Sequence, residues 1–198
     1  MTDGVIKFQY RKTGPALPCG EQLDELNYWR SQLHELGLIG VDNAGIGFGN
    51  VSCLHAGQII ISASATGYIP SLDPSHYCLI DRYDIPSMQV HYTGALPPSS
   101  ELLSHAVVYE TLPEVKAVTH IHHFELWQRL RGEVLTTPDD VSYGTRQMAE
   151  ALEKSVSTVD ELPAVVVMGG HTAGILAIGM DVKSIAEYLI SLHNKIVS

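Results

Sequence analysis

The spacing of apolar residues along the chain predicts three helices. Within residues 21–37, apolar side chains recur every three or four positions, which is typical of an amphipathic helix, and the glycine-rich segment that follows should end it. A second helix is expected after Ser99 or Ser100, either of which can cap its first turn, and Pro113 should stop it. From Asp181 onward, another apolar face at helical spacing predicts a last helix.

Four shorter segments have the pattern of β-strands. The segment 115–122 is β-branched and alternating, whereas 164–168 and 175–178 are apolar runs typical of buried strands. A further short strand is expected over 58–62. Because these strands are interspersed with helices, the pattern favours a mixed α/β domain over a helix bundle or a β-sandwich.

The whole chain, residues 1–198, is expected to form one domain. A chain of 198 residues with 45% hydrophobic content can bury a core without disulfides, and it contains no internal repeat or linker-like segment that would mark a boundary. Its apolar stretches are too short to cross a bilayer, and the start MTDGVIKFQYRK lacks the apolar run of a signal peptide. A cytoplasmic protein without a membrane partner is therefore expected.

Cysteine content and charge narrow the chemistry further. Cys19, Cys53 and Cys78 are an odd number without C-x-x-C spacing, which favours small buried or half-buried side chains over a disulfide framework or a thiolate metal site. The formal net charge is −10 and basic residues do not cluster, so nucleic acid is not an expected partner. A small phosphorylated substrate can still bind, because backbone N–H groups in loops and at helix starts attract anions whatever the net charge.

The segment V-T-H-I-H-H, residues 118–123, contains the main candidates for metal binding. Residues two apart on a strand project from the same face, so His120 and His122 can share an ion, whereas His123 points to the other face and is expected to be structural. A hydrogen-bonded histidine pair is the simpler alternative. A catalytic zinc site needs a third protein ligand, and His171 in G-G-H-T-A-G is the best candidate because adjacent glycines allow a turn to present its imidazole.

Glu101 lies at the expected start of the second helix, where two interpretations are open. A carboxylate at this position is favoured by the helix dipole alone, without any further function. If the fold brings this helix start to the histidines, Glu101 becomes a candidate acid/base group beside the ion. The position of the residue in the sequence does not decide between the two.

An ordered set of motifs resembles the class II aldolase/adducin family, which includes zinc-dependent sugar-phosphate aldolases. The motifs are G-N-V-S (49–52), T-G (66–67), P-S-S-E (98–101), H-I-H (120–122) and G-H-T-A-G (170–174). The resemblance runs from about Glu21 to Lys195, and His105, Pro113 and Y-G-T (143–145) add smaller agreements. Five motifs in order are far more specific than any one of them, so the metal-binding interpretation of the histidine pair gains weight. A dinucleotide-binding interpretation of G-I-G-F-G (45–49) fits neither the spacing nor the preceding strand of that fingerprint.

The resemblance implies a three-layer αβα sandwich around a central, mostly antiparallel sheet, assembled as a homotetramer. It also implies that His120, His122 and His171 hold zinc, or another divalent ion such as Mn²⁺, Co²⁺ or Fe²⁺, which stabilises the enediolate of a small phosphorylated ketose or related hydroxycarbonyl compound. Glu101 would bind the resting ion or carry a proton. The residues implied in phosphate binding are Gly49, Asn50, Ser52, Thr66, Gly67, Ser99 and Ser100. Taken singly, each of these seven is equally compatible with an ordinary turn or cap.

The sequence departs from the family pattern in two places. Thr172 and Ala173 follow His171, where family members commonly have a glycine directly after the histidine. The sequence also contains no tyrosine beyond Tyr188, although a tail tyrosine assists proton transfer in the sugar-phosphate aldolases. Tyr143, Asp139 or Asp140 would have to serve instead.

Three functions remain open after the sequence is read. The preferred hypothesis is a metal-dependent aldehyde-lyase of the class II aldolase type. An epimerase or a thioribulose-phosphate dehydratase could use the same site, and the family also contains decarboxylating members. A non-catalytic scaffold like the adducin head domain is disfavoured, because that domain lacks the metal ligands, whereas the three histidines and Glu101 are all present in this sequence.

Overall fold

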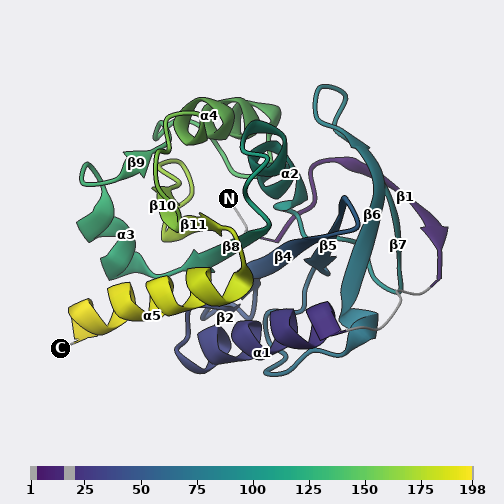
Figure 1. Cartoon of the computed structure of the whole chain (residues 1–198), viewed down its shortest axis with the longest axis horizontal. Coiled ribbons are helices and arrows are strands. Elements are labelled where there is room, and N and C mark those ends of the chain that lie inside the picture. Colours follow the sequence, from purple (N-terminus) through teal and green to yellow (C-terminus); the bar gives the residue numbers. More distant parts are fainter. Residues whose placement is uncertain (1–3, 16–20, 198) are drawn as a thin grey trace.

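The computed structural model describes residues 4–15 and 21–197 and contains one large sheet with helices on both of its faces (Figure 1). The helices are α1 (Glu21–Glu35), α2 (Leu102–Thr111), α3 (Phe124–Leu130), α4 (Arg146–Val156) and α5 (Val182–Val197), with a 3-10 turn at Pro74–His76. The strands are β1 (Gln9–Gly14), β2 (Gly40–Val41), β3 (Gly47–Phe48), β4 (Asn50–His55), β5 (Gln58–Ser62), β6 (Tyr77–Asp84), β7 (Gln89–Gly94), β8 (Ala117–His122), β9 (Leu135–Thr136), β10 (Ala164–Val167) and β11 (Gly174–Gly179).

Nine of these strands form the large sheet, in the order β1-β7-β6-β5-β4-β8-β11-β10-β9. Neighbouring strands are antiparallel, except for the two edge pairs β1–β7 and β10–β9, which are parallel. The short strands β2 and β3 pair separately as an antiparallel ribbon. Strand β8 therefore lies in the middle of the sheet, where β4 and β11 hold it on either side.

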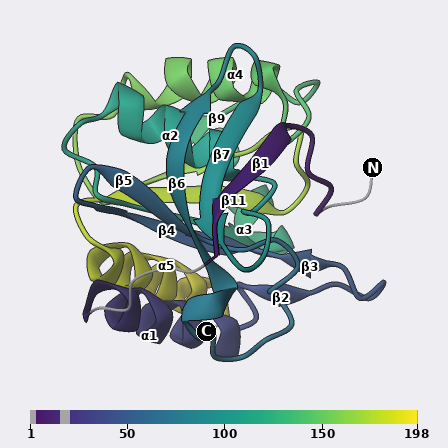
Figure 2. The same cartoon turned by 90° about the vertical axis from the view of Figure 1, so that its right-hand side faces the viewer.

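The helices cover the sheet on both faces, α2 and α4 on one and α1, α3 and α5 on the other (Figures 1 and 2). Alternate residues of β8 divide between the two hydrophobic cores: Val118 packs in the core under α2 and α4, and Ile121 in the core under α1 and α5. This arrangement confirms the expected αβα sandwich with a mostly antiparallel central sheet. No helix among the described residues is long and apolar enough to cross a membrane.

The expected elements are present with small differences in their ends. Strand β5 has the predicted bounds, α1, β8, β10 and β11 each lie within two residues of the expected limits at both ends, and α5 begins one residue after the expected start at Asp181. One expectation was wrong: neither Ser99 nor Ser100 caps α2, because the N-cap residue is Glu101. The reason is a turn before the helix, in which the Ser99 carbonyl accepts from the N–H of Leu102 at 3.1 Å and the Ser99 hydroxyl accepts from the N–H of Glu101 at 3.3 Å.

Two of the three cysteines are buried, as expected. Cys53 and Cys78 are buried thiols without a disulfide, and burial raises the pKa of Cys53 to about 11 and that of Cys78 to about 12. Both are thus unreactive neutral side chains of the two cores. Cys19 lies outside the described residues.

Candidate metal centre

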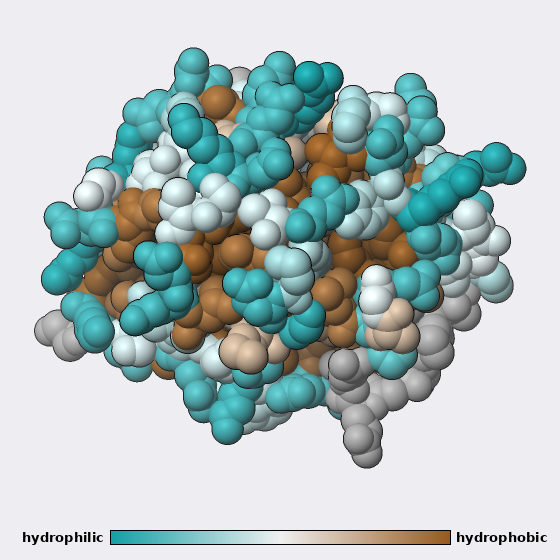
Figure 3. All heavy atoms as spheres, turned by 45° about the horizontal axis from the view of Figure 1, so that its top comes forward, coloured by the Kyte–Doolittle hydropathy of each residue, from teal (hydrophilic) through white to brown (hydrophobic). Residues whose placement is uncertain are grey.

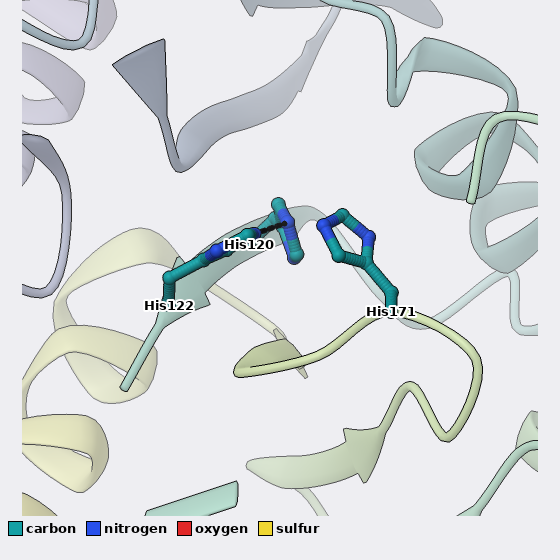
Figure 4. Close-up of side chains that lie close together, drawn as sticks. All are labelled: His120, His122 and His171. Carbon is teal, nitrogen blue, oxygen red and sulfur yellow. Dashed lines mark hydrogen bonds between the residues drawn. The ribbon is translucent and has the colours of Figure 1, made fainter. Parts of the chain in front are cut away.

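His120 and His122 are the last inward-facing residues of β8, on the sheet face covered by α2 and α4. His120 pairs with Asn50 of β4 on one side and with Leu176 of β11 on the other, while His122 pairs with Gly174. Both side chains leave the strand on the same face, as alternation requires, and Figure 4 shows them directed toward a third imidazole.

The third imidazole belongs to His171, which lies in the loop between β10 and β11 (Figure 4). The His171 N–H donates to the Met168 carbonyl at 3.1 Å, and the His171 carbonyl accepts from the N–H of Gly174 at 2.8 Å. The two preceding glycines allow the loop to pack against the backbone of residues 137–141, because a Cβ would lie 2.1 Å from Thr137 O at position 169 and 2.0 Å from Val141 O at position 170. Backbone contacts thus fix the position of His171.

The turn after His171 accommodates the unusual T-A pair at some backbone strain. Ala173 has a φ of 68°, in the left-handed region where residues with a Cβ pay roughly 1 to 2 kcal/mol. Its carbonyl accepts from the N–H of His123 at 3.0 Å, which holds this turn against the end of β8. The loop therefore keeps the imidazole near the strand even though a residue with a side chain occupies the left-handed position.

The three rings lie close enough to bind one ion. Their centroids are 4.9 Å apart for His120 and His122, 5.0 Å for His120 and His171, and 4.6 Å for His122 and His171. The Nε2 atoms of His120 and His122 are 3.0 Å apart, close to the roughly 3.3 Å between two nitrogens of a tetrahedral zinc site. The candidate ligand atoms of all three lie within 4.8 Å of one another.

The surroundings of His120 favour the form that binds a metal. Burial holds the pKa of His120 well below its ordinary value, and the neighbouring His122 and His171 lower it further, so the ring is neutral. Its Nδ1 lies 3.2 Å from the Ile175 carbonyl, and an Nδ1–H donating to that oxygen leaves the lone pair on Nε2, the atom that faces His122. Three imidazoles with converging nitrogens are the donor set that zinc and similar divalent ions take.

Aromatic rings pack against two of the imidazoles. The ring of Phe48, at the end of β3, stacks on His122 with a centroid distance of 5.1 Å and an interplanar angle of 17°. The ring of Tyr143 lies 4.7 Å from that of His171. His123 does not belong to the cluster: its Nδ1 accepts from the N–H of Leu126 at 3.1 Å and so caps α3, which is the structural role expected for it.

Glu101 lies beside the three histidines, at the start of α2. The residue is 2% exposed, and its Oε1 atom is 3.8 Å from His171 Nδ1. The hydroxyl of Ser104 donates to the other carboxylate oxygen, Oε2, at 2.7 Å, which fixes the orientation of the group. The helix start therefore carries an oriented carboxylate next to the imidazoles, as the functional interpretation of Glu101 requires.

A small pocket opens over these residues. Six of the seven residues expected around a phosphate line it: Gly49, Asn50, Thr66, Gly67, Ser99 and Ser100. Among the described residues, the buried Oδ1 of Asn50 has no hydrogen-bond partner, so the pocket offers this atom to a donor group of a ligand. Gly49 has a φ of 77°, which explains why glycine occupies the position directly before Asn50.

Ser52 is the exception, because it does not line the pocket. Its hydroxyl is buried under α2, 2.7 Å from His105 Nδ1 and 2.7 Å from the Tyr109 hydroxyl. Burial lowers the pKa of His105 to about 3 and raises that of Tyr109 well above its ordinary value, so both groups are neutral. In this structure Ser52 links β4 to α2 below the pocket floor.

Of the three residues considered as substitutes for the family's tail tyrosine, Tyr143 is the one that lines the pocket. Asp139 bonds Arg131 at 2.6 Å on the surface, and Asp140 is exposed. Tyr143 is also held from outside, since Lys7 Nζ lies 3.8 Å from the centre of its ring and donates to its carbonyl at 2.6 Å.

Several lining residues escaped the sequence analysis. Phe48, Gly47, Ser64 and Gly4 carry no signal of function on their own; Gly47 and Phe48 belong to β3, whereas Gly4 and Ser64 lie outside the helices and strands. Of these four, Phe48 was the easiest to notice in the sequence, because a lone aromatic residue within the glycine-rich 45–49 segment needs a packing partner. Its packing partner is His122, which the sequence predicted as a metal ligand on other grounds.

Comparison with known structures identifies the same fold in several proteins. Sugar-phosphate aldolase from Thermotoga maritima aligns with a TM-score of 0.68 and 18% identity, covering 88% of this chain and 91% of its own. L-fuculose-1-phosphate aldolase from Thermus thermophilus aligns with a TM-score of 0.62 and 16% identity, covering 86% of this chain and 88% of its own. YgbL from Klebsiella pneumoniae, described as a candidate aldolase, epimerase or decarboxylase, aligns with a TM-score of 0.64 and 17% identity, covering 88% of this chain and 86% of its own. At such identities these alignments establish the fold alone.

The family assignment has its own evidence. No curated protein matches the sequence. The family model described as the class II aldolase and adducin N-terminal domain matches residues 40–196, which include every motif singled out in the sequence and all three histidines. This chain therefore belongs to the class II aldolase/adducin family.

Proposed function

We propose that this protein is a divalent-metal-dependent aldehyde-lyase that acts on a small phosphorylated ketose or related hydroxycarbonyl compound. One observation carries the proposal: His120, His122 and His171 converge from a strand and a distant loop, with the Glu101 carboxylate 3.8 Å from His171. A family member with a purely scaffolding role has no need of this arrangement. The combination of three imidazole nitrogens with an adjacent carboxylate suits metal-assisted proton chemistry.

The three imidazoles are the proposed ligands of the ion, and zinc is the first candidate because its sites favour three protein nitrogens and an open position. When bound there, such an ion supplies the positive charge that stabilises an enediolate. The protein side chains do the rest: they orient the substrate, exclude water and move protons. Mn²⁺, Co²⁺ and Fe²⁺ remain alternatives, because nitrogen ligands also suit them.

Glu101 is the proposed acid/base group. Its Oε2 accepts from the Ser104 hydroxyl, and that hydrogen bond keeps Oε1 on the side of the histidines. Tyr143 is the proposed second proton carrier, because it lines the pocket beside His171 and Asp139 and Asp140 do not. Two such groups beside His171 would allow one to remove a proton and the other to deliver one.

The phosphate is proposed to bind where loop and helix-start residues meet, at Gly49, Asn50, Thr66, Gly67, Ser99 and Ser100. These residues supply backbone N–H groups, an amide and hydroxyls, which suit phosphate oxygens. Ser52 is left out of this set, since its hydroxyl bonds His105 and Tyr109. We further propose that the protein is a homo-oligomer, a tetramer by analogy with its family, and works in the cytoplasm.

A substrate panel tests the reaction. The metal-loaded protein is incubated with ketose 1-phosphates, pentulose 5-phosphates and methylthioribulose phosphate, and the products are identified by NMR. Release of an aldehyde supports the lyase. A new stereoisomer or loss of water would instead assign an epimerase or a dehydratase that uses the same site, and an absence of turnover together with an absence of bound metal would favour the scaffold.

A further inference from the structure

The loop that carries Thr66 and Gly67 into the pocket is held from behind by helix α1. Asn27 on α1 accepts from the N–H of Leu72 at 2.9 Å and donates from Nδ2 to Ser71 Oγ at 3.4 Å. Arg30, one turn further along, reaches the part of the loop nearest the pocket. One polar stripe of α1 therefore holds the whole loop while the apolar residues of the helix pack on the sheet.

Arg30 binds four consecutive or nearly consecutive carbonyl oxygens of this loop. Its Nη2 donates to Thr66 O at 3.1 Å and to Gly67 O at 3.4 Å, and its Nη1 donates to Ile69 O and, at 2.9 Å, to Pro70 O. The side chain is only 1% exposed, which is rare for arginine. A planar guanidinium with five donors can bind four acceptors in this way, whereas a lysine ammonium cannot span them.

These contacts fix the direction of the peptide groups in this part of the loop. In a planar trans peptide the carbonyl and the following N–H point in opposite directions, so a guanidinium that fixes Thr66 O also turns the Gly67 N–H away from α1. On its other side Gly67 packs without any spare room, since a Cβ there would lie 2.3 Å from Gly40 O and 3.0 Å from Phe48 N. The loop is clamped between Arg30 and the β2–β3 ribbon, with its donors oriented in advance.

Arg30 also brings a positive charge that the pocket itself lacks. No lysine or arginine is among the described residues that line the pocket, and the protein as a whole carries a formal charge of −10, which repels anions. Within the described part of the chain no carboxylate contacts the guanidinium, and its hydrogen bonds there all go to carbonyl oxygens. Burial lowers the pKa of Arg30, but a guanidinium remains protonated at neutral pH.

We infer that Arg30 is a positioning residue of the anion subsite: its buried guanidinium shapes the 66–70 loop and supplies, through that loop, the positive charge that a substrate phosphate needs. This inference rests on the proposed function, because it assumes that the loop receives the phosphate group. Arg30 does not touch the substrate, and its effect reaches the phosphate through the carbonyl and N–H groups of Thr66 and Gly67.

Phosphate binding by Arg30 variants tests the inference. The metal-loaded full-length chain is titrated with inorganic phosphate by ³¹P NMR, and metal content and thermal unfolding are measured for every variant. Arg30→Met removes both the positive charge and the planar set of N–H donors. We expect its Kd for phosphate to rise at least about tenfold while the metal content stays unchanged. Arg30→Lys keeps the charge but cannot bind four carbonyl oxygens, so its Kd for phosphate should lie between those of the wild type and Arg30→Met.

Arg146→Met is the matched control, because Arg146 is an exposed residue of α4 that bonds Glu150 at 2.8 Å. It removes the same charge from the surface and should leave the Kd for phosphate unchanged. With any substrate that the panel reveals, Arg30→Lys should raise KM and alter kcat by less than about threefold, since Arg30 acts on binding and not on the chemical step.

The outcomes separate this inference from the proposed function. Equal phosphate affinity in the wild type and a folded Arg30→Met or Arg30→Lys variant overturns the role of Arg30, even if the enzyme binds metal and turns over. If Arg30→Met does not fold, Arg30→Lys alone tests the inference. Wild-type phosphate affinity in Arg30→Lys would contradict the need for the planar set of guanidinium N–H donors. A wild-type protein that binds metal but no phosphate overturns the inference outright, whereas a protein without metal or turnover overturns the proposed function instead.

Discussion

The position and the neighbours of Glu101 support the acid/base role proposed for it. A carboxylate at a helix start is favoured by the helix dipole, and that alone would explain its presence. Here the residue is the N-cap of α2, is buried, and has one oxygen held by Ser104 and the other 3.8 Å from His171 Nδ1. Burying a carboxylate costs free energy unless it is paired or bound to a cation, and the proposed metal ion at the three imidazoles would provide that cation.

Replacement of Glu101 by glutamine tests its role in proton transfer. Glu101→Gln keeps the size and the hydrogen bond from Ser104 but cannot exchange a proton, so we expect kcat to fall by about 10²- to 10⁴-fold while the fold and the bound ion are retained. Steady-state kinetics and metal analysis check this expectation. Glu114→Gln, an exposed substitution in the turn after α2, serves as the control and should leave kcat unchanged. An undiminished rate in Glu101→Gln would remove Glu101 from the mechanism.

At the residue scale, the sequence predicts some parts of the site by simple geometry and others only by resemblance. Alternation along a strand is enough to put His120 and His122 on one face, because the period of a strand leaves no choice. Nothing local connects His171 or Glu101 to that strand, since each comes from a distant loop or helix start. Arg30 could not be found at all, because an arginine on an amphipathic helix is read as a solvent-exposed residue until the loop behind it is seen.

At the scale of single elements, the loop between β10 and β11 places His171 by backbone contacts. Gly170 lies against the Val141 carbonyl, which a Cβ at position 170 would approach to 2.0 Å. Gly170→Ala must therefore move the loop and His171 with it. We expect the affinity for the divalent ion to fall by about 10- to 100-fold, the range typical for loss of the groups that orient a ligand.

Metal titration with a competing chelator measures this loss. The matched control is Gly132→Ala, in the turn after α3, where no atom lies within 4 Å of the added Cβ and only the positive φ of 80° adds strain. That variant should bind the ion as the wild type does. Wild-type metal affinity in Gly170→Ala would show that the loop does not depend on this close contact.

The buried His105 of α2, which contacts Ser52 of β4, should make the stability of the protein depend on pH. His105 is buried with its pKa lowered to about 3, whereas an unfolded histidine has a pKa of about 6.5. Between these values the unfolded chain binds a proton that the folded chain does not, so His105 lowers the free energy of unfolding as pH falls from about 6.5 toward 3, by at most about 1.4 kcal/mol per pH unit. Above pH 6.5 this contribution does not change with pH.

Denaturant unfolding of the chelator-treated protein at several pH values measures the slope. His105→Gln removes the titrating group and retains an amide that can bond Ser52, so its slope below pH 6.5 should be smaller than that of the wild type by up to the same amount. Parallel pH profiles for the two proteins would contradict the assignment of a buried, neutral His105.

The elements that the sequence predicted share one property: their apolar patterns face a core. Strand β5 and the central strands β8, β10 and β11 have buried residues at nearly every position. The edge strand β1 is exposed along most of its length and has no such pattern, and it is held by pairing with β7. Helix α4 was not predicted, although it has an apolar stripe at Met148, Ala149, Leu152 and Val156.

At the scale of the whole molecule, the sequence pattern predicted a mixed α/β fold, and the resemblance supplied the layers and the mostly antiparallel sheet. Local periodicity could not give the strand order, because the pairing of β4 with β8 and of β8 with β11 joins segments that are far apart in the chain. The single-domain organisation of residues 1–198 stays a prediction.

The surface is compatible with self-association. Figure 3 shows hydrophobic residues reaching the surface between hydrophilic ones, and Tyr68, Phe124 and Met180 are each more than half exposed. We expect a homotetramer, so sedimentation equilibrium should give four times the chain mass of 21.6 kDa. A monomer at micromolar concentration would contradict this expectation.

Metal stoichiometry tests the central claim of the account most directly. The purified protein, stripped with a chelator and reconstituted with zinc, is analysed for bound metal together with His120→Ala and His171→Ala. We predict one ion per chain in the wild type, removal by the chelator, and a greatly weakened site in both variants. A wild-type protein that binds no ion after reconstitution, or variants that bind it as tightly, would contradict a metal centre built from these three histidines.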